Sequence, residues 1–137
     1  MELVPGISEC PSHTDFTYVV VSSSTAVGHV FDIAVTLCFS RSQMQLRFDG
    51  LLGFPGGFVD STDQSIVDGL NRELVEEINF DVDMHRVSQD HFVMSCVCSH
   101  RKMVTHFYAI EVTIAQYEDI EKRTFAAHDW GSEVRQF

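Results

Sequence analysis

RELVEEINF, at residues 72–80, is the stretch of sequence that decides the fold of this chain. Four apolar residues recur at every fourth position before and within it: Ile66, Leu70, Leu74 and Ile78. That spacing places them on one face of an amphipathic helix, so we predict a helix over residues 65–78. Ser65 followed by Asp68 predicts a capping box at its start, in which the two side chains reciprocally satisfy backbone N–H groups. Asn79 predicts a left-handed residue at its end.

Three glutamates of this predicted helix lie beside its apolar face. With about 100° between successive residues, Glu73 and Glu77 fall roughly 20° to either side of Ile66, and Glu76 falls roughly 80° away. Carboxylates in such positions repel one another and lose hydration, which raises their pKa values or destabilises the fold unless positive charge is supplied. Arg72 can supply part of this charge, and a hard divalent cation with oxygen ligands, Mg²⁺ or Mn²⁺, can supply the rest.

A solvated acidic helix face is the ordinary alternative for a run of glutamates. Two features favour the metal site instead: the glutamates overlap the apolar edge of the helix, and a Gly56-Gly57 turn precedes the helix. Gly69 lies between Glu73 and Glu76 on the helix surface and has no side chain. We therefore expect room beside Gly69 for the waters of a metal ion or for a phosphate.

At these residues the chain resembles the Nudix hydrolase family, whose box reads Gly, five residues, Glu, seven residues, Arg-Glu-(apolar)-x-Glu-Glu-x-Gly-(apolar). Residues 72–80 match the second half of this box, with Asn79 in place of the last glycine. The first half departs from it. Gln64 stands where the family has its first glutamate, and Gly57 lies one residue too far upstream.

Two longer runs, MQLRFDGLLGFPGGFVD at residues 44–60 and SIVDGLNREL at residues 65–74, are similar to the snoRNA-decapping branch of Nudix hydrolases. This branch is also known as inosine diphosphatases, and syndesmos is a relative. We interpret residues 1–137 as a single Nudix-like domain. Residues 43–110 match best, residues 1–42 form divergent N-terminal strands, and the C-terminal end is truncated.

The resemblance implies an α/β fold, the Nudix α/β/α sandwich with a mixed sheet, here lacking the C-terminal helix. A sheet face without that helix would leave apolar surface uncovered, so we expect a homodimer or marginal stability. The implied activity is metal-dependent hydrolysis of a diphosphate linkage, in an inosine diphosphate-like nucleoside diphosphate or in a capped RNA 5′ end. The alternative is a catalytically weak or inactive Nudix-fold protein that binds or regulates, as proposed for syndesmos.

The resemblance also implies roles for individual residues. Glu73, Glu76 and Glu77 are expected to bind the metal, and one of them is a candidate to relay a proton. Arg72 is expected to orient these carboxylates through charge-assisted hydrogen bonds. The Gly57 carbonyl is a further expected metal ligand, because two glycines let the turn expose it.

Further candidates lie outside the core of the box. An acid from a later loop serves as base or extra ligand in the family, and Glu133 is the first candidate here and Asp129 the second. For each of them an ordinary exposed acid is an equal alternative. Phe58 and His106 lie in matched stretches and are candidate substrate contacts, although a packed strand histidine is the favoured alternative for His106.

The composition is that of one small globular domain. The chain has 137 residues, of which 45% are hydrophobic and 21% charged, enough to bury a core. Its formal net charge of −11 disfavours nonspecific binding to nucleic acid, which ordinarily needs Lys and Arg. We therefore rank small nucleotides level with RNA ends. We expect no signal peptide, no membrane-spanning helix and reduced cysteines, which is typical of a nuclear or cytoplasmic protein.

Apolar and β-branched runs predict the remaining elements. We expect strands at residues 16–21, 30–39 and 43–48, a hairpin of residues 92–98 and 103–112, and a helix at residues 114–122 capped by Thr113. In the strand at residues 43–48, apolar Met44, Leu46 and Phe48 alternate with polar residues. This pattern predicts that the apolar face is buried and that Gln45 faces solvent.

Overall fold

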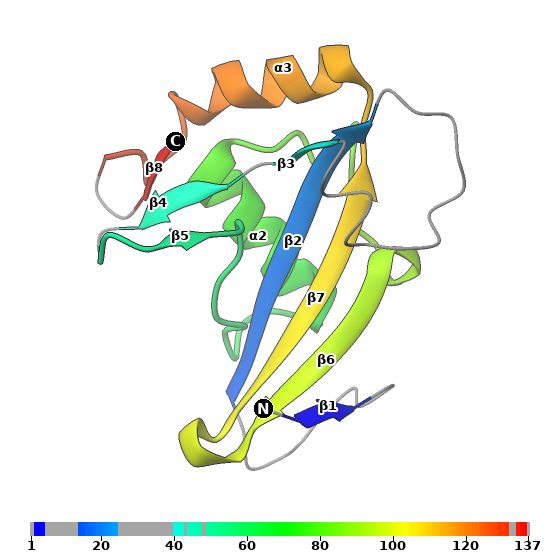
Figure 1. The fold of residues 1–137 in the computed structure, drawn as a ribbon, viewed down its shortest axis with the longest axis vertical. Helices are drawn as coiled ribbons and strands as arrows, with labels where there is room; N and C mark the ends of the chain where they lie inside the picture. Colours follow the sequence, from blue (N-terminus) through cyan, green and yellow to red (C-terminus); the bar gives the residue numbers. More distant parts are fainter. Residues whose placement is uncertain are drawn as a thin grey trace.

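The structure is a computed structural model that describes residues 2–4, 14–24, 40–42, 44–47, 49–131 and 134–136. The described part forms two sheets and two α-helices (Figure 1). Two predictions, the strand at residues 30–39 and the candidate base Glu133, lie outside the described residues.

The larger sheet has five strands in the order β1-β6-β7-β2-β3. They are β1 (Glu2–Val4), β2 (Thr14–Ser24), β3 (Ser40–Ser42), β6 (Phe92–Cys98) and β7 (Met103–Glu111). β2 runs parallel to β7, and the other neighbours pair antiparallel. The predicted α/β class with a mixed sheet is therefore confirmed. The predicted hairpin is also confirmed, with a 3-10 turn at Ser99–Arg101 between β6 and β7.

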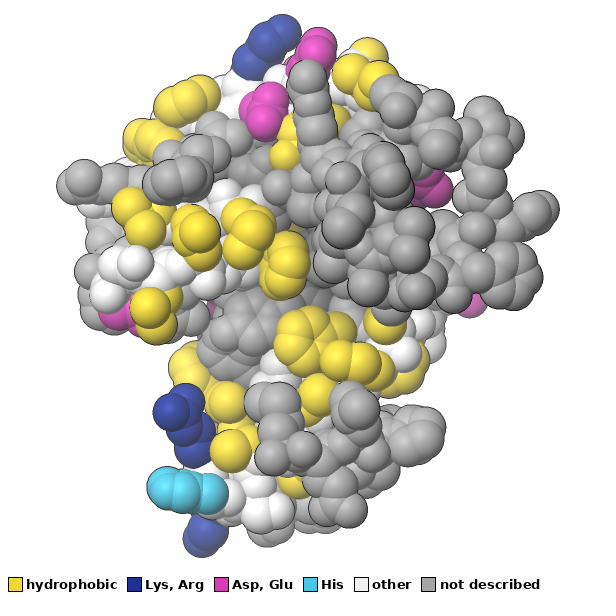
Figure 2. Space-filling view, viewed as in Figure 1, with side chains coloured by type: hydrophobic (Ala, Val, Ile, Leu, Met, Phe, Trp, Pro, Cys, Tyr) yellow, Lys and Arg dark blue, Asp and Glu magenta, His cyan; other side chains and the backbone are white. Residues whose placement is uncertain are grey.

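The smaller sheet has the order β5-β4-β8. It contains β4 (Gln45–Arg47), β5 (Leu52–Gly53) and β8 (Val134–Gln136), all antiparallel. Figure 2 shows hydrophobic side chains gathered over this part of the surface, where Leu51 and Leu52 are exposed.

The predicted orientation of β4 is wrong. Gln45 is only 2% exposed, whereas Met44 and Leu46 are only partly buried. The Gln45 side chain turns inward because it meets a polar partner there, the carboxylate of Glu77 on the helix α2 (Ile66–Ile78).

α2 confirms the helix predicted from the four-residue spacing. At its start Ser65 Oγ accepts a hydrogen bond from the Asp68 N–H at 3.1 Å, as expected. The expected reciprocal bond is wrong, because the Asp68 carboxylate accepts from the Ser65 hydroxyl at 2.7 Å and not from its backbone. At the end of the helix, Asn79 has φ 50° and ψ 43°, the predicted left-handed conformation.

The second helix, α3 (Ile114–Thr124), begins at the predicted cap. Thr113 Oγ1 accepts from the Gln116 N–H at 3.2 Å, and Gln116 Oε1 accepts from the Thr113 N–H at 2.8 Å. α3 ends at Thr124 instead of residue 122, because the prediction of helix ends from sequence is uncertain by a few residues.

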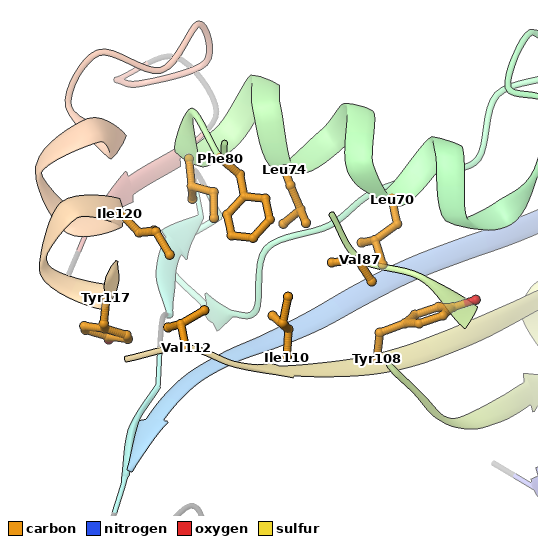
Figure 3. Close-up of a cluster of buried hydrophobic side chains, with 10 residues drawn as sticks. Leu70, Leu74, Phe80, Val87, Tyr108, Ile110, Val112, Tyr117 and Ile120 are labelled. Carbon is orange, nitrogen blue, oxygen red and sulfur yellow. The ribbon is translucent and has the colours of Figure 1, made fainter. Parts of the chain in front are cut away.

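The hydrophobic core lies between α2, α3 and β7 (Figure 3). Its buried residues are Leu70, Leu74, Ile78, Phe80, Val87, Tyr108, Ile110, Val112, Tyr117 and Ile120. Both helices contribute to this one cluster. The second helical layer of the sandwich stays a prediction, and so does the homodimer. None of the described helices is both long and apolar enough to cross a bilayer.

Candidate active site

The Gly56-Gly57 turn lies directly against α2. A Cβ atom at Gly57 would collide with the Glu73 carboxylate, so any other residue there would force the Glu73 side chain out of its present position. The Gly57 carbonyl accepts hydrogen bonds from the Thr17 N–H at 2.8 Å and from the Thr17 hydroxyl at 3.2 Å. A metal ion at this carbonyl, as predicted, would therefore have to displace the Thr17 hydroxyl.

Arg72 is the centre of the charged network. Its Nη1 lies 2.9 Å from Glu73 Oε1 and 3.0 Å from Glu76 Oε2. Its Nη2 donates to the Phe58 carbonyl at 3.0 Å and lies 3.5 Å from Asp60 Oδ2. One guanidinium thus holds two of the three glutamates and the loop before α2, which is the geometry that the predicted orienting role requires.

Asp63 is absent from the residues predicted above, but it makes the most extensive contact with Arg72. Its carboxylate accepts from Nε and from Nη2, both at 3.1 Å, and from the Asp60 N–H at 2.8 Å. The Arg72 guanidinium lowers the pKa of Asp63. Gln64, at the position of the family's first glutamate, is exposed. The acid that pairs with Arg72 is its neighbour in sequence, Asp63. The displacement of Gly57 by one residue from the family box was the sequence signal that could have indicated this shift.

The space beside Gly69 is filled by protein. A Cβ atom there would lie 2.8 Å from Asp63 Oδ2 and 3.3 Å from Val59 Cγ1. The expectation that Gly69 leaves room for metal-bound waters or a phosphate is therefore wrong. The glycine instead lets the loop that carries Asp63 pack against α2.

Glu77 is the most deeply buried of the three glutamates, at 9% exposed. Its Oε2 accepts from the Gly56 N–H at 2.9 Å and from Gln45 Nε2 at 3.4 Å. Burial raises the pKa of Glu77 to about 7, and the negative charge of Glu73 adds to the rise. Burial also raises the pKa of Glu73, although its hydrogen bond with Arg72 opposes the rise.

The three glutamates share one face of α2 without converging on one point. Glu73 and Glu76 share Nη1 of Arg72, whereas Glu77 turns to Gly56. In the part of the chain that the structure describes, no three His, Cys, Asp or Glu side chains are grouped closely enough to hold a metal ion. The donor chemistry still fits Mg²⁺ or Mn²⁺, which take carboxylate oxygens. Binding would require Glu73 and Glu76 to exchange Arg72 for the cation.

The second candidate base, Asp129, lies beside α2. Its N–H donates to the Glu76 carbonyl at 3.0 Å, and its Oδ1 lies 2.7 Å from His128 Nδ1. The hydrogen bond with Asp129 raises the pKa of His128. The negative charge of Asp129 is also among the causes of the raised pKa of Glu77.

The two candidate substrate contacts differ in exposure. Phe58 is 52% exposed, and its backbone is bound to Arg72, so its ring is accessible next to the acidic cluster. His106 is 1% exposed, and its Nδ1 lies 2.8 Å from Ser95 Oγ. The structure therefore places His106 as a packed strand histidine and does not bring it to the surface of the site.

Comparison with known proteins matches residues 20–135 to a family described as Nudt16-like: U8 snoRNA-decapping enzyme-like. A U8 snoRNA-decapping enzyme of Homalodisca vitripennis is 50% identical over 91 residues, which cover 66% of this chain and 48% of that protein. A Tudor-interacting repair regulator protein of Homo sapiens is 41% identical over 93 residues, which cover 66% of this chain and 42% of that protein.

Among solved structures, an ADP-ribose pyrophosphatase of Streptococcus suis is 19% identical, with a TM-score of 0.40, over 72% of this chain and 59% of that chain. The chain spans less than half the length of the two sequence relatives. The family match covers most of the chain and confirms the resemblance drawn from the box residues. This chain therefore belongs to the Nudt16-like family of U8 snoRNA-decapping enzyme-like proteins.

Proposed function

We propose that this chain hydrolyses a diphosphate linkage with the help of Mg²⁺ or Mn²⁺. Its substrate is a nucleoside diphosphate of the inosine diphosphate kind or the capped 5′ end of an RNA. The observation that carries the proposal is the buried carboxylate of Glu77 beside Glu73 and Glu76 on one helix face. Membership of a family described by its likeness to a U8 snoRNA-decapping enzyme supports the class of reaction.

The balance of charge favours uptake of a cation. Arg72 contacts the carboxylates of four residues: Asp60, Asp63, Glu73 and Glu76. One positive charge cannot neutralise four negative ones, and the described contacts of Glu77 are with neutral donors. A dication held by Glu73, Glu76 and Glu77 would reduce this excess of negative charge.

When bound, the metal supplies neutralisation of the nonbridging phosphate oxygens, activation of the attacking water and alignment of the leaving group. The protein residues keep the site in place for this chemistry. Arg72 fixes the loop before α2 through Asp63 and the Phe58 carbonyl. The Gly56 N–H fixes one oxygen of Glu77.

Proton transfer needs a group that changes its charge near neutral pH. Among Glu73, Glu76 and Glu77, one carboxylate is the expected relay on α2. Asp129 lies next to α2 through its contact with Glu76 and is the described candidate for the base. Glu133 stays the first candidate from sequence.

The substrate is held by residues at the site itself and not along an extended basic surface. The exposed ring of Phe58 offers a stacking surface for a base beside the acidic cluster, and base stacking on aromatic rings does not require a particular base. A net charge of −11 disfavours nonspecific binding to long nucleic acid, which ordinarily needs an excess of Lys and Arg. Small nucleotides and RNA ends therefore rank equally, and a nuclear or cytoplasmic location suits both.

A second candidate function is a Nudix-fold protein that binds or regulates with little or no turnover. The observation that favours it is the similarity to a Tudor-interacting repair regulator protein, at 41% identity. The retained carboxylates of Glu73, Glu76 and Glu77 favour the hydrolase, because binding alone gives no reason for three acids at one buried edge.

Turnover of inosine diphosphate, other nucleoside diphosphates and capped RNA, with and without Mn²⁺, tests the proposal. We expect phosphate-bond cleavage that stops with a chelator and falls at least a hundredfold in Glu77→Gln. Asp83→Asn, which changes an exposed acid, is the matched control and should cleave like the wild type. A folded wild-type chain that cleaves none of these substrates would favour the binding protein, and cleavage without metal would reject the mechanism.

A further inference from the structure

Gln45 of β4 reaches the site from outside the helix that carries the acids. Its side chain is buried, and its Nε2 lies 3.4 Å from Glu77 Oε2. We propose that Gln45 is a positioning residue that holds Glu77 in the orientation in which this carboxylate takes up a divalent cation. This inference rests on the function proposed above. It adds a residue of the smaller sheet to a site whose acids lie on α2.

Both hydrogen-bond donors to Glu77 bind the same carboxylate oxygen. Oε2 accepts from the Gly56 N–H at 2.9 Å and from the Gln45 amide at 3.4 Å. None of the described residues donates a hydrogen bond to Oε1. Two donors from separate elements, the turn and β4, restrict rotation of the carboxyl group, and we assign the cation to Oε1.

An amide suits this task better than a charged side chain. A Lys or Arg at position 45 would form an ion pair with Glu77 and would compete with the metal for it. The glutamine amide donates a hydrogen bond without a positive charge. The carboxylate therefore keeps its negative charge for the dication while its orientation is fixed.

The backbone of Gln45 is held from both sides. In β4 it pairs with Gly53 of β5 and with Gln136 of β8, so the strand has little freedom to shift. A buried amide without a partner is also costly, and the contact with Glu77 satisfies one of its donors. Gln45 and Glu77 thus fix each other where β4 faces α2.

The test is the affinity of the metal-free chain for Mn²⁺, measured without substrate from the electron paramagnetic resonance signal of unbound Mn²⁺. Gln45→Met keeps the length of the side chain and removes the donor. Gln45→Asn keeps the amide but draws it back by one methylene. We expect both to weaken Mn²⁺ binding about tenfold, the typical effect of one lost hydrogen bond to a charged group. Gln89→Met, at an exposed glutamine, should bind Mn²⁺ like the wild type.

Each outcome decides the inference. Weaker binding in every Gln45 variant that folds, with wild-type binding by Gln89→Met, supports the positioning role. Wild-type affinity in a folded Gln45→Met or Gln45→Asn overturns it and leaves the proposed function standing. If both variants lose their circular dichroism spectrum, Gln45 serves the stability of β4 and the inference is wrong. Absence of Mn²⁺ uptake by the wild type overturns the proposed function, and the inference with it.

Discussion

At the scale of the residue, the site contains two shielded carboxylates whose partners differ. Asp63 accepts two hydrogen bonds from the Arg72 guanidinium, which lowers the pKa of Asp63. Glu77 accepts only from the neutral amide groups of Gly56 and Gln45, and burial raises its pKa to about 7. The first acid therefore holds the loop on the helix, whereas the second remains in need of a cation.

The raised pKa of Glu77 predicts how the stability of the metal-free chain depends on pH. The ordinary value of 4.5 applies to the unfolded chain, and about 7 to the folded chain, so the folded state binds this proton more tightly. The resulting stabilisation is fully present below about pH 4.5 and is lost as the pH rises through 7, a change of up to about 3 kcal/mol.

Denaturant unfolding between about pH 5 and about pH 8 measures this change in the free energy of unfolding. Glu77→Gln does not titrate, so its stability should fall less steeply over the same range. Asp83→Asn is the control and should follow the wild type. Equal pH dependence in Glu77→Gln and in the wild type would contradict the assignment of the raised pKa to Glu77.

The contact between Asp63 and Arg72 predicts a loss of stability in Asp63→Asn. The substitution leaves Arg72 facing a neutral acceptor, and we expect the free energy of unfolding to fall by about 1–3 kcal/mol. Gln64→Glu restores the family residue at an exposed position and should change stability by less than about 0.5 kcal/mol. Denaturant titration measures both. An unchanged Asp63→Asn would show that Arg72 does not depend on this acid.

At the scale of the element, the sequence predicts α2 best because its pattern is local. The four-residue spacing of Leu70, Leu74 and Ile78 suffices to place one helix face, and Asn79 alone marks the end. In β4 the alternation predicts burial of the apolar face, yet Gln45 on the polar face is buried. Gln45 is buried because Glu77 faces it, and that pairing brings together residues 32 positions apart.

The contacts of the turn and loop before α2 could be predicted only in part. Most of these contacts are not marked by any short sequence pattern. The two glycines indicated a tight approach, and the structure shows that Gly57 makes it to Glu73. That Asp63 pairs with Arg72, and that Asp63 and Val59 fill the space beside Gly69, depends on the path of the whole loop. The spacing of residues along the chain does not predict the path of this loop.

The end of α2 gives a prediction at this scale. Asn79 is left-handed at φ 50°, a conformation that costs an ordinary L-residue roughly 1–2 kcal/mol. We therefore expect Asn79→Ala to lower the free energy of unfolding by about 1 kcal/mol, and Asn79→Gly to preserve it or raise it slightly. Thermal and denaturant unfolding compare the two variants. An alanine variant as stable as the glycine variant would contradict the left-handed end.

At the scale of the whole molecule, one core positions the site. Leu70 and Leu74 pack α2 toward β7 and α3 (Figure 3), and Ile78 belongs to the same buried cluster. The glutamate edge of the helix faces the glycine turn and β4. The acids are held where they are because the adjoining face of the same helix is buried. Loss of core packing should therefore weaken both the fold and the site.

Leu74→Ala tests this dependence. Leu74 is completely buried, and removal of such a side chain costs about 2–5 kcal/mol in the free energy of unfolding. Val75→Ala, at the exposed neighbouring position, should cost less than about 1 kcal/mol. Denaturant unfolding gives both values. Equal losses in the two variants would contradict the assignment of Leu74 to the core.

Calorimetric titration of Mn²⁺ into the metal-free wild-type chain and into Glu77→Gln tests the central claim most directly. We expect saturable uptake by the wild type, accompanied by a higher melting temperature as is usual for a ligand of the folded state, and strongly reduced uptake by Glu77→Gln. A folded wild-type chain that takes up no Mn²⁺, or a Glu77→Gln variant that binds it equally well, would contradict the claim that the acidic face of α2 is a divalent-cation site.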